Sequence, residues 1–278
     1  MKISIITPCR NAIRSLEETM DSILNQRAVL SGRVELEYVI VDGASDDGTQ
    51  DLARRSGVRV LSEKDAGLYD AVAKGMLTTT GDVVAYCNAG DTYHAGAFDV
   101  VAELFQRPEI QWLTGFRVGM NEASQVTDVR LQRPFRRAFF ENGIYAGGPL
   151  PTVQQESTFW RRSLHDSVDL KKLRSFRLAG DFYLWQCFSS VAQVTTVDAF
   201  LGAHRIHRGQ LSENQSAYHQ EVHSICRKAT WRERITARWD AGDRGVIARA
   251  GNAMFGLPPM GGAGFFFDHS KQAWRVFD

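Results

Sequence analysis

Residues 67–91, GLYDAVAKGMLTTTGDVVAYCNAGD, decide the fold, because a helix, a turn and a buried strand follow one another within them. The apolar spacing predicts a helix over roughly Leu68 to Leu77. After the Thr-Thr-Thr-Gly-Asp turn, the apolar run from Val83 to Cys87 predicts a strand that stops at Asn88-Ala89-Gly90-Asp91. A carboxylate therefore stands just past the end of a buried strand, where it can face a ligand.

The same arrangement occurs earlier in the chain, at residues 41–49, VDGASDDGT. Here a strand ends on Asp42 and turns into a helix from about Thr49, through Ser and Asp residues that suit a turn and a helix N-cap. Two further apolar strands are expected at Lys2 to Thr7 and Val58 to Leu61, each followed by a helical pattern. Strands that alternate with helices imply an α/β fold with a parallel sheet.

Right-handed crossovers put the carboxyl ends of parallel strands on one edge of the sheet, where open α/β sheets bind ligands. The residues expected at this edge are polar or charged: Thr7-Pro8-Cys9-Arg10, Asp42, Glu63 to Asp65, and Asn88 to Asp91. A single Asp after a strand is commonly only a helix N-cap. Carboxylates from three strand ends repel one another unless a cation neutralises them, so this edge suits a metal-bound diphosphate.

The composition of the 278-residue chain excludes several classes of protein. With 44% hydrophobic residues it can bury a full core, as one domain or as one domain with an extension. A net charge of +1 gives no global field that would recruit nucleic acid. The four cysteines lack zinc-ligand spacing and the N-terminus lacks a signal-peptide pattern, so we expect a reduced, cytoplasmic protein. No apolar run reaches the roughly 18 residues of a membrane span.

Seven motifs in a fixed order make the chain resemble the family 2 inverting glycosyltransferases, which have the GT-A fold. The motifs are SIITPCRNA, VIVDGASDDGT, SEKDAGLYDAVAKG, TTGDVVAYCNAGD, QQESTFWRRSL, AGDFYLW and HRIHRGQLS, between Ile3 and about Ser212. The resemblance implies a Rossmann-like, mostly parallel sheet flanked by helices, with a C-terminal helical extension. It also implies transfer of a hexose from a nucleoside-diphosphate sugar, above all a UDP-sugar, to a hydroxyl of a glycan or lipid-linked glycan. Assembly of bacterial surface polysaccharides is the role that this family suggests.

The resemblance implies a divalent metal, Mg²⁺ or Mn²⁺, held by Asp91 beside the leaving diphosphate. Relatives commonly have two adjacent acids in this motif, and Gly90 stands here in place of the first. Ala73 stands where many relatives have Asn, so one donor contact is expected to be absent. An ordinary helix N-cap is the structural alternative for Asp91. With the other motifs present, we favour the metal role.

The donor contacts implied by the resemblance come from several segments of the chain. The expected base pocket consists of Thr7, Pro8, Arg10 and Asp42. In this pocket the Asp42 carboxylate would accept a hydrogen bond from N3–H of uracil. The other expected contacts are Asp65, Tyr69, Asp70, Lys74, Asn88, Gln155, Arg205 and His207. Simpler roles exist for some of them, because Asp42 lies in a turn-rich stretch and Asp70 with Lys74 has the i, i+4 spacing of a helical ion pair.

Inversion needs a base that removes the proton of the acceptor hydroxyl as the new bond forms. By resemblance this base is Asp181, at the start of a helix over Phe182 to Phe188. The helix dipole at that position keeps a carboxylate ionised, as a base requires. An ordinary N-cap has the same geometry, so that alternative stays open.

Two other polar segments carry expected contacts. Gln154 and Gln155 either bind hydroxyls of the sugar or acceptor, or are buried residues of a strand predicted over Val153 to Trp160. The loop at 203–212 contains the cationic or titratable residues His204, Arg205, His207 and Arg208. A loop of this composition suits closure over a diphosphate.

We expect a catalytic domain over residues 1–215, with a nucleotide-sugar half at 1–107 and an acceptor half at 108–215. Residues 216–278 form a basic helical extension with a Gly- and Phe-rich tail, whose basic residues include Arg227, Lys228, Arg232, Arg234, Arg238, Arg244 and Arg249.

The extension has two open interpretations. Trp231, Ile235 and Trp239 recur at i, i+4 and i+8, which suits an amphipathic helix on the anionic inner surface of the plasma membrane. A helix packed on the domain with a solvated basic face is the alternative. The run from Phe265 to Phe267 suits either a self-association patch or a tip that touches a membrane.

Other classes of protein compete with glycosyl transfer. A nucleotidyltransferase usually has a Gly-rich basic loop after its first strand, and Thr7 to Asn11 contains no glycine. A dehydrogenase would have GxGxxG at that place. A non-catalytic nucleotide- or sugar-binding protein of the same fold would account for Gly90 and Ala73, but the presence of both Asp91 and Asp181 argues against it.

Overall fold

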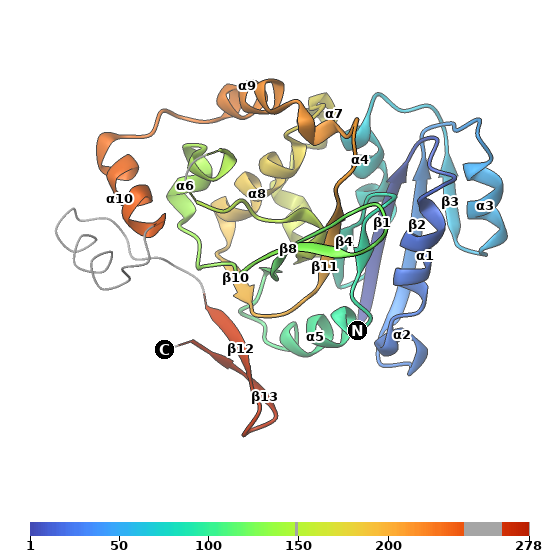
Figure 1. Cartoon of the computed structure of the whole chain (residues 1–278), viewed down its shortest axis with the longest axis horizontal. Coiled ribbons are helices and arrows are strands. Elements are labelled where there is room, and N and C mark those ends of the chain that lie inside the picture. The colour runs from blue at the N-terminus through green and yellow to red at the C-terminus, as the bar shows by residue number, and fades with distance from the viewer. Residues whose placement is uncertain (148–149, 242–262, 278) are drawn as a thin grey trace.

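The computed structural model describes residues 1–147, 150–241 and 263–277 (Figure 1). Within them, nine strands form the central sheet: β1 (Lys2–Cys9), β2 (Glu35–Asp42), β3 (Arg59–Ser62), β4 (Val83–Tyr86), β6 (Trp112–Thr114), β9 (Thr158–Arg161), β10 (Val194–Val197), β12 (Gly264–Asp268) and β13 (Ala273–Val276). Their order is β13-β12-β10-β6-β9-β4-β1-β2-β3. Only β9 and β13 run antiparallel to their neighbours, which confirms the predicted mostly parallel sheet.

A smaller sheet lies beside the central one, in the order β5-β11-β7-β8. Its strands are β5 (Thr92–Tyr93), β7 (Arg117–Met120), β8 (Val126–Arg130) and β11 (Gly202–Arg205). The described α-helices are α1 (Leu16–Leu24), α2 (Arg27–Leu30), α3 (Thr49–Arg55), α4 (Leu68–Thr78), α5 (Ala97–Leu104), α6 (Arg137–Glu141), α7 (Leu170–Ser175), α8 (Gly180–Val191), α9 (Gln215–Ile225) and α10 (Trp231–Ala241). Short 3₁₀ helices occur at η1 (Ile144–Ala146), η2 (Gln155–Ser157), η3 (Arg162–Ser167) and η4 (Leu211–Glu213).

Strand β1 lies inside the sheet between β2 and β4, and all of its residues except Lys2 are buried. A parallel strand covered on both faces is rich in apolar residues, and Ile3, Ile5 and Ile6 supply them here. Helix α4 packs against β1 and β2 at very close range, because a Cβ on Gly75 would overlap the Ile6 side chain. The predicted strands and helices of residues 2–87 are present, with their ends shifted by a few residues.

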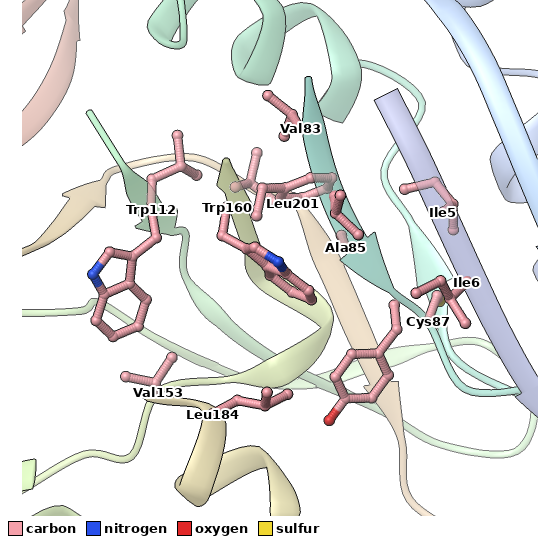
Figure 2. Packing of buried hydrophobic residues seen from close by; sticks show 14 of the residues in the cluster. Ile5, Ile6, Val83, Ala85, Cys87, Trp112, Val153, Trp160, Leu184 and Leu201 are labelled. Carbon is pink, nitrogen blue, oxygen red and sulfur yellow. The ribbon is translucent and has the colours of Figure 1, made fainter. Parts of the chain in front are cut away.

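Aromatic side chains fill the second half of the core. Trp112 of β6 stacks on Trp185 of α8, with ring centroids 5.6 Å apart and an interplanar angle of 15°. Trp160 of β9 meets Trp185 edge to face at 6.1 Å. Figure 2 shows Trp112 and Trp160 on neighbouring strands, with Leu184 of α8 facing them. Burial of these large rings accounts for much of the apolar area that fixes α8 on the sheet.

The structure corrects the strand prediction over Val153 to Trp160. Only Thr158–Arg161 is a strand, and the preceding residues Gln155–Ser157 form the 3₁₀ helix η2. The hydroxyl of Ser157 donates to the Phe116 carbonyl at 2.8 Å, so the side chain fixes the bent segment against a neighbouring loop. Strands β6 and β7, which are separated by only two residues, likewise belong to different sheets.

The described residues after 215, at 216–241 and 263–277, contribute Val222, Ala237, Phe265 and Trp274 to the same hydrophobic core as the rest of the molecule. Strand β12 pairs with β10 and Phe265 is 2% exposed, so the prediction of an exposed patch is wrong for this residue. The sequence did not predict the β12–β13 hairpin, because β12 pairs with a strand far away in the chain. Figure 1 shows the hairpin at one end of the sheet, distant from α4.

The buried residues of helix α10 are Glu233, Thr236, Ala237 and Asp240. Of the predicted apolar positions, Ile235 and Trp239 are half-buried and Trp231 is exposed. The Asp240 carboxylate accepts two hydrogen bonds from the Arg136 guanidinium, at 2.6 and 3.0 Å, and both side chains are buried. Arg244 and Arg249 of the expected extension lie outside the described residues. None of the helices that the structure describes is long and apolar enough to cross a bilayer.

Candidate active site

A cavity of about 900 Å³ opens at the carboxyl ends of β1 and β4, where the sequence predicted a ligand site. Its wall includes Pro8 to Arg10, Asp65 to Tyr69, Asn88 to Asp91, Gln154 to Glu156, Arg177, Leu178, Asp181, His204, Arg205, His207 and Tyr218. A cavity of this size accommodates a ligand of drug or cofactor dimensions.

One group of side chains in this wall has the composition of a metal site. Atoms of Asp91, Glu156 and His204 that can bind a metal all lie within 4.8 Å of one another. His204 Nδ1 is 3.2 Å from Asp91 Oδ1 and 3.5 Å from Glu156 Oε1. Both carboxylates are buried, so two negative charges meet away from bulk water with one imidazole between them.

The pKa values of this group reflect its crowding. Burial and the negative charge of Glu156 raise the pKa of Asp91 above its ordinary value. Burial disfavours the charged form of His204, but hydrogen bonds to Asp91 and Glu156 outweigh it and raise the pKa of His204 to about 11. Burial also acts to raise the pKa of Glu156, yet the hydrogen bond and charge of His204 hold it below the usual range. The group therefore needs a positive charge, from a protonated imidazole or from a metal.

The backbone around Asp91 depends on the glycine before it. Gly90 has φ of 113°, in a region that side-chain-bearing residues rarely adopt. The hydroxyl of Thr19 accepts from Gly90 N and donates to Asp91 O, both at 2.8 Å. The main-chain N–H of Arg205 donates to Asp91 Oδ1 at 2.8 Å. The glycine in place of the usual acid is therefore what this turn requires to aim Asp91 into the cavity.

Glu156 is the residue of this cluster that the sequence did not predict. A strand over Val153 to Trp160 would make it an alternating buried residue, whereas η2 turns both Gln155 and Glu156 toward the cavity. Strand β11 lies directly against this turn, because a Cβ on Gly202 would overlap the Glu156 carbonyl. The available signal in the sequence was an acid in the motif QQES, directly after the predicted contacts Gln154 and Gln155.

Asp181 lines the same cavity as the second residue of α8. Burial raises the pKa of Asp181 to about 6, with a smaller rise from the charge of Glu156. Its Oδ1 accepts from the main-chain N–H of Phe182 at 2.7 Å, and this hydrogen bond partly offsets the rise of the pKa. A carboxylate with a pKa near neutrality, open to a cavity, has the properties of a general base.

The structure brings most of the predicted donor residues to the cavity wall, including Pro8, Arg10, Asp65, Tyr69, Asn88, Gln155, Arg205 and His207. Tyr69 donates its hydroxyl to the Leu178 carbonyl at 3.0 Å, which joins α4 to the segment before α8. The amide nitrogen of Asn88 donates to Gln155 Oε1 at 3.0 Å and to Asp91 Oδ2 at 3.2 Å. The buried Oδ1 of Asn88 has no hydrogen-bond partner among the described residues.

Four predicted donor residues are absent from the cavity wall. The hydroxyl of Thr7 accepts from Tyr38 in the core at 3.0 Å. Asp42 is fully buried and accepts from the Ser62 hydroxyl at 2.8 Å and from the Ser45 hydroxyl. Asp70 and Lys74 form the helical ion pair, at 3.3 Å.

Arg205 and His207 reach the cavity in different ways. The Arg205 side chain is buried and is bound to Glu18, to the Gly90 carbonyl and to the turn between β7 and β8. Its guanidinium therefore ties the elements around Asp91 together. The side chain of His207 is exposed, and among the described residues its imidazole bonds only to the Arg208 carbonyl, at 3.0 Å, so it is available to a ligand.

The chain belongs to glycosyl transferase family 2. The family model matches residues 4–169, which is more than half of the chain. A curated relative, the PGL/p-HBAD biosynthesis glycosyltransferase of Mycobacterium bovis, is 30% identical over 201 residues, covering 69% of this chain and 72% of the relative.

Solved structures resemble this glycosyltransferase in fold. Staphylococcus aureus TarS in complex with UDP-GlcNAc has a TM-score of 0.57 and 16% identity, and the match covers 77% of this chain and 61% of that chain. The glucosyl-3-phosphoglycerate synthase of Mycobacterium tuberculosis in complex with UDP has a TM-score of 0.54 and 17% identity, over 99% of this chain and 87% of that chain. A mannosyltransferase from Pyrobaculum calidifontis in complex with GDP-Man and Mn²⁺ has a TM-score of 0.57 and 16% identity, and the match covers 91% of this chain and 73% of that chain. The predicted GT-A fold is confirmed.

Proposed function

We propose that this glycosyltransferase moves a hexose from a UDP-sugar to an acceptor hydroxyl in a single displacement with inversion. The observation that carries the proposal is the presence of two functional groups in one cavity: the cluster of Asp91, Glu156 and His204, and the separate carboxylate of Asp181. The first suits a diphosphate held through a metal, and the second suits proton removal from an acceptor.

The cluster fits a divalent cation. Two buried carboxylates and one imidazole offer a donor set that Mn²⁺ accepts well, and carboxylates with phosphate oxygens and water also suit Mg²⁺. Asp91, Glu156 and His204 would hold the ion, which when bound neutralises the charge that develops on the leaving diphosphate. His204 must lose its proton to act as a ligand, so metal affinity is expected to rise with pH.

In the proposed reaction Asp181 acts as the base. The acceptor oxygen forms a bond to the anomeric carbon while the bond from that carbon to the diphosphate oxygen breaks. The Asp181 carboxylate takes the proton of the acceptor hydroxyl, and attack from the face opposite the leaving group inverts the anomeric centre. Burial serves this role because it makes the carboxylate more basic than an exposed aspartate.

Several side chains are proposed to bind the donor. Pro8, Arg10 and Asp65 surround one part of the cavity, and the unpartnered Oδ1 of Asn88 suits a sugar hydroxyl. Asp42, Thr7, Asp70 and Lys74 remain predicted contacts that require movement of the chain around them. Structural relatives bind UDP, UDP-GlcNAc or GDP-Man, so the nucleotide base needs a direct test.

The test is release of nucleoside diphosphate from a panel of UDP-, GDP- and TDP-sugars, with Mn²⁺ and with wild-type or Asp181→Asn protein. Release that requires Asp181 supports the proposal. Retained turnover in Asp181→Asn contradicts the assignment of the base. Nucleotide binding without any release would instead support the non-catalytic alternative.

A glycan or lipid-linked glycan of the bacterial surface is the proposed acceptor. The support is the relative that shares 30% identity, whose name places it in PGL/p-HBAD biosynthesis. We divide the chain functionally as 1–215 for catalysis and 216–278 as an extension, although Tyr218 of the extension also lines the cavity.

Peripheral contact with an anionic membrane is proposed for α10. Trp231, Arg234 and Arg238, at i, i+3 and i+7, share the helix face opposite the packed residues Glu233 and Asp240. Trp231 is 60% exposed, and both arginines are exposed. A Trp between arginines suits the headgroup region of an anionic bilayer.

Co-sedimentation with phosphatidylglycerol and phosphatidylcholine vesicles tests this contact. We expect binding to the anionic vesicles only, and loss of binding in Arg234→Glu combined with Arg238→Glu. Equal partition of wild type and the double variant would contradict it.

A further inference from the structure

Helix α9 holds the segment that leads into the catalytic helix. The Glu221 carboxylate accepts three main-chain N–H groups, from Arg177 at 3.0 Å, Leu178 at 2.9 Å and Ala179 at 2.8 Å. These residues immediately precede α8, whose second residue is Asp181. A side chain from a distant part of the chain therefore fixes the backbone next to the proposed base.

The local sequence offers no substitute for this contact. Ala179 stands at the N-cap of α8, and its side chain makes no capping hydrogen bond. The free N–H groups at the start of a helix need an acceptor when they are away from water. The Glu221 carboxylate is the acceptor for the N–H of the N-cap Ala179, and it also accepts from Arg177 and Leu178 just before the helix. Because this carboxylate is charged, it forms stronger bonds than a neutral oxygen would.

A second helix fixes the same segment from another side. The Tyr69 hydroxyl of α4 donates to the Leu178 carbonyl at 3.0 Å. The Tyr69 ring packs directly on Gly180, because a Cβ at that glycine would overlap the ring. The backbone just before Asp181 is thus held between Tyr69 and Glu221. We therefore expect the Asp181 carboxylate to have little freedom of position.

We propose that Glu221 is a positioning residue for glycosyl transfer, which sets the place of Asp181 relative to the acceptor hydroxyl. The inference rests on the proposed role of Asp181 as the base. A displacement of about 1 Å in a reacting group can lower the rate about a hundredfold, so an anchor of three hydrogen bonds is of catalytic consequence. Tyr218, one turn before Glu221 on α9, lines the cavity, so the anchor belongs to an element that also forms the site.

The test compares Glu221→Gln with Gln220→Ala, an exposed position next to it on α9. The glutamine retains the size of the side chain, but its amide group turns a donor toward main-chain N–H groups. We expect turnover of the UDP-sugar that wild type hydrolyses fastest, with water as acceptor, to fall about tenfold or more in Glu221→Gln. The KM for that donor, UDP binding by calorimetry and the melting temperature should stay close to wild type. Glu221→Asp, which keeps the charge on a shorter side chain, should recover part of the rate.

Amide hydrogen exchange gives a readout that needs no turnover. Exchange at residues 177–179 should be faster in Glu221→Gln than in wild type or Gln220→Ala, while exchange in the core strand β1 should be unchanged. Unchanged exchange at 177–179 would overturn the inference, as would a rate loss matched by an equal loss of UDP binding and of melting temperature.

The same data separate this inference from the proposed function. Undiminished turnover in Asp181→Asn would remove Asp181 as base, whatever Glu221→Gln does. A strong loss in Asp181→Asn together with wild-type turnover in Glu221→Gln would overturn only the positioning role.

Discussion

Replacement of Asp181 by asparagine is expected to make the protein more stable and inactive at the same time. The pKa of this carboxyl lies at about 6, against an ordinary value of 3.8. A folded-state pKa above the unfolded one means that the folded protein binds this proton more tightly. The resulting contribution to stability is complete below about pH 3.8 and is lost as the pH rises through 6.

The difference between these two pKa values corresponds to about 3 kcal/mol, an upper value for a half-buried group. Asparagine is neutral at every pH and keeps an oxygen that can accept from Phe182 N. At pH 7 we therefore expect Asp181→Asn to raise the free energy of unfolding by up to about 3 kcal/mol, and at pH 4 to change it little. Activity should fall by about a hundredfold or more, as expected for loss of a general base.

Urea denaturation at pH 4 and pH 7, without metal, measures the first effect, and UDP release measures the second. Asp21→Asn, an exposed aspartate on α1, is the matched control and should change neither quantity. In wild type, the rate should fall about tenfold from pH 7 to pH 5, since about 91% of a base with this pKa is ionised at pH 7 and about 9% at pH 5. A variant that is less stable than wild type at pH 7 would refute the idea that this carboxylate is held ionised at a cost in stability.

Three further predictions concern the site and its support. Glu156→Gln should weaken Mn²⁺ binding about tenfold or more by calorimetry, because it removes one of two buried charges, and unaltered affinity would exclude Glu156 as a ligand. Gly90→Ala should lower the free energy of unfolding by about 1–3 kcal/mol, because its φ of 113° strains any side-chain-bearing residue, and an unchanged denaturation midpoint would argue against that turn. Asp240→Asn should lower the free energy of unfolding by about 3–5 kcal/mol, because the buried Arg136 guanidinium loses the carboxylate that lies 2.6 Å from it, and an unchanged free energy of unfolding would show that this contact does not hold α10.

The parallel half of the fold was predictable because local pattern decides it. Strand β1 is indicated by closely spaced apolar residues, and helix α4 by apolar residues at helical spacing. Turn-forming residues after each element indicate where it ends. The second half is less regular, since η2 and β11 are fixed by contacts such as Ser157 with Phe116 and not by their own periodicity. The β12–β13 hairpin was missed for the same reason, because its partner β10 lies far away in sequence.

The candidate site was predictable where a motif places a residue at a strand or helix end, as for Asp91 and Asp181. Tertiary contacts determine where the other candidate residues lie. Thr7 faces the core instead of the cavity, because Tyr38 binds its hydroxyl. Arg205 was predicted to bind phosphate, but its guanidinium is bound by the main chain around Asp91. Glu156 was overlooked, since only the turn at η2 brings it beside His204.

Calorimetric titration of UDP into wild type and Asp91→Ala, each with and without Mn²⁺, tests the account most directly. We predict UDP binding to wild type that strengthens at least about tenfold with Mn²⁺, and no such metal effect in Asp91→Ala. UDP binding that is independent of both the metal and Asp91, or no binding to wild type at all, would contradict a metal-supported diphosphate site at this cluster.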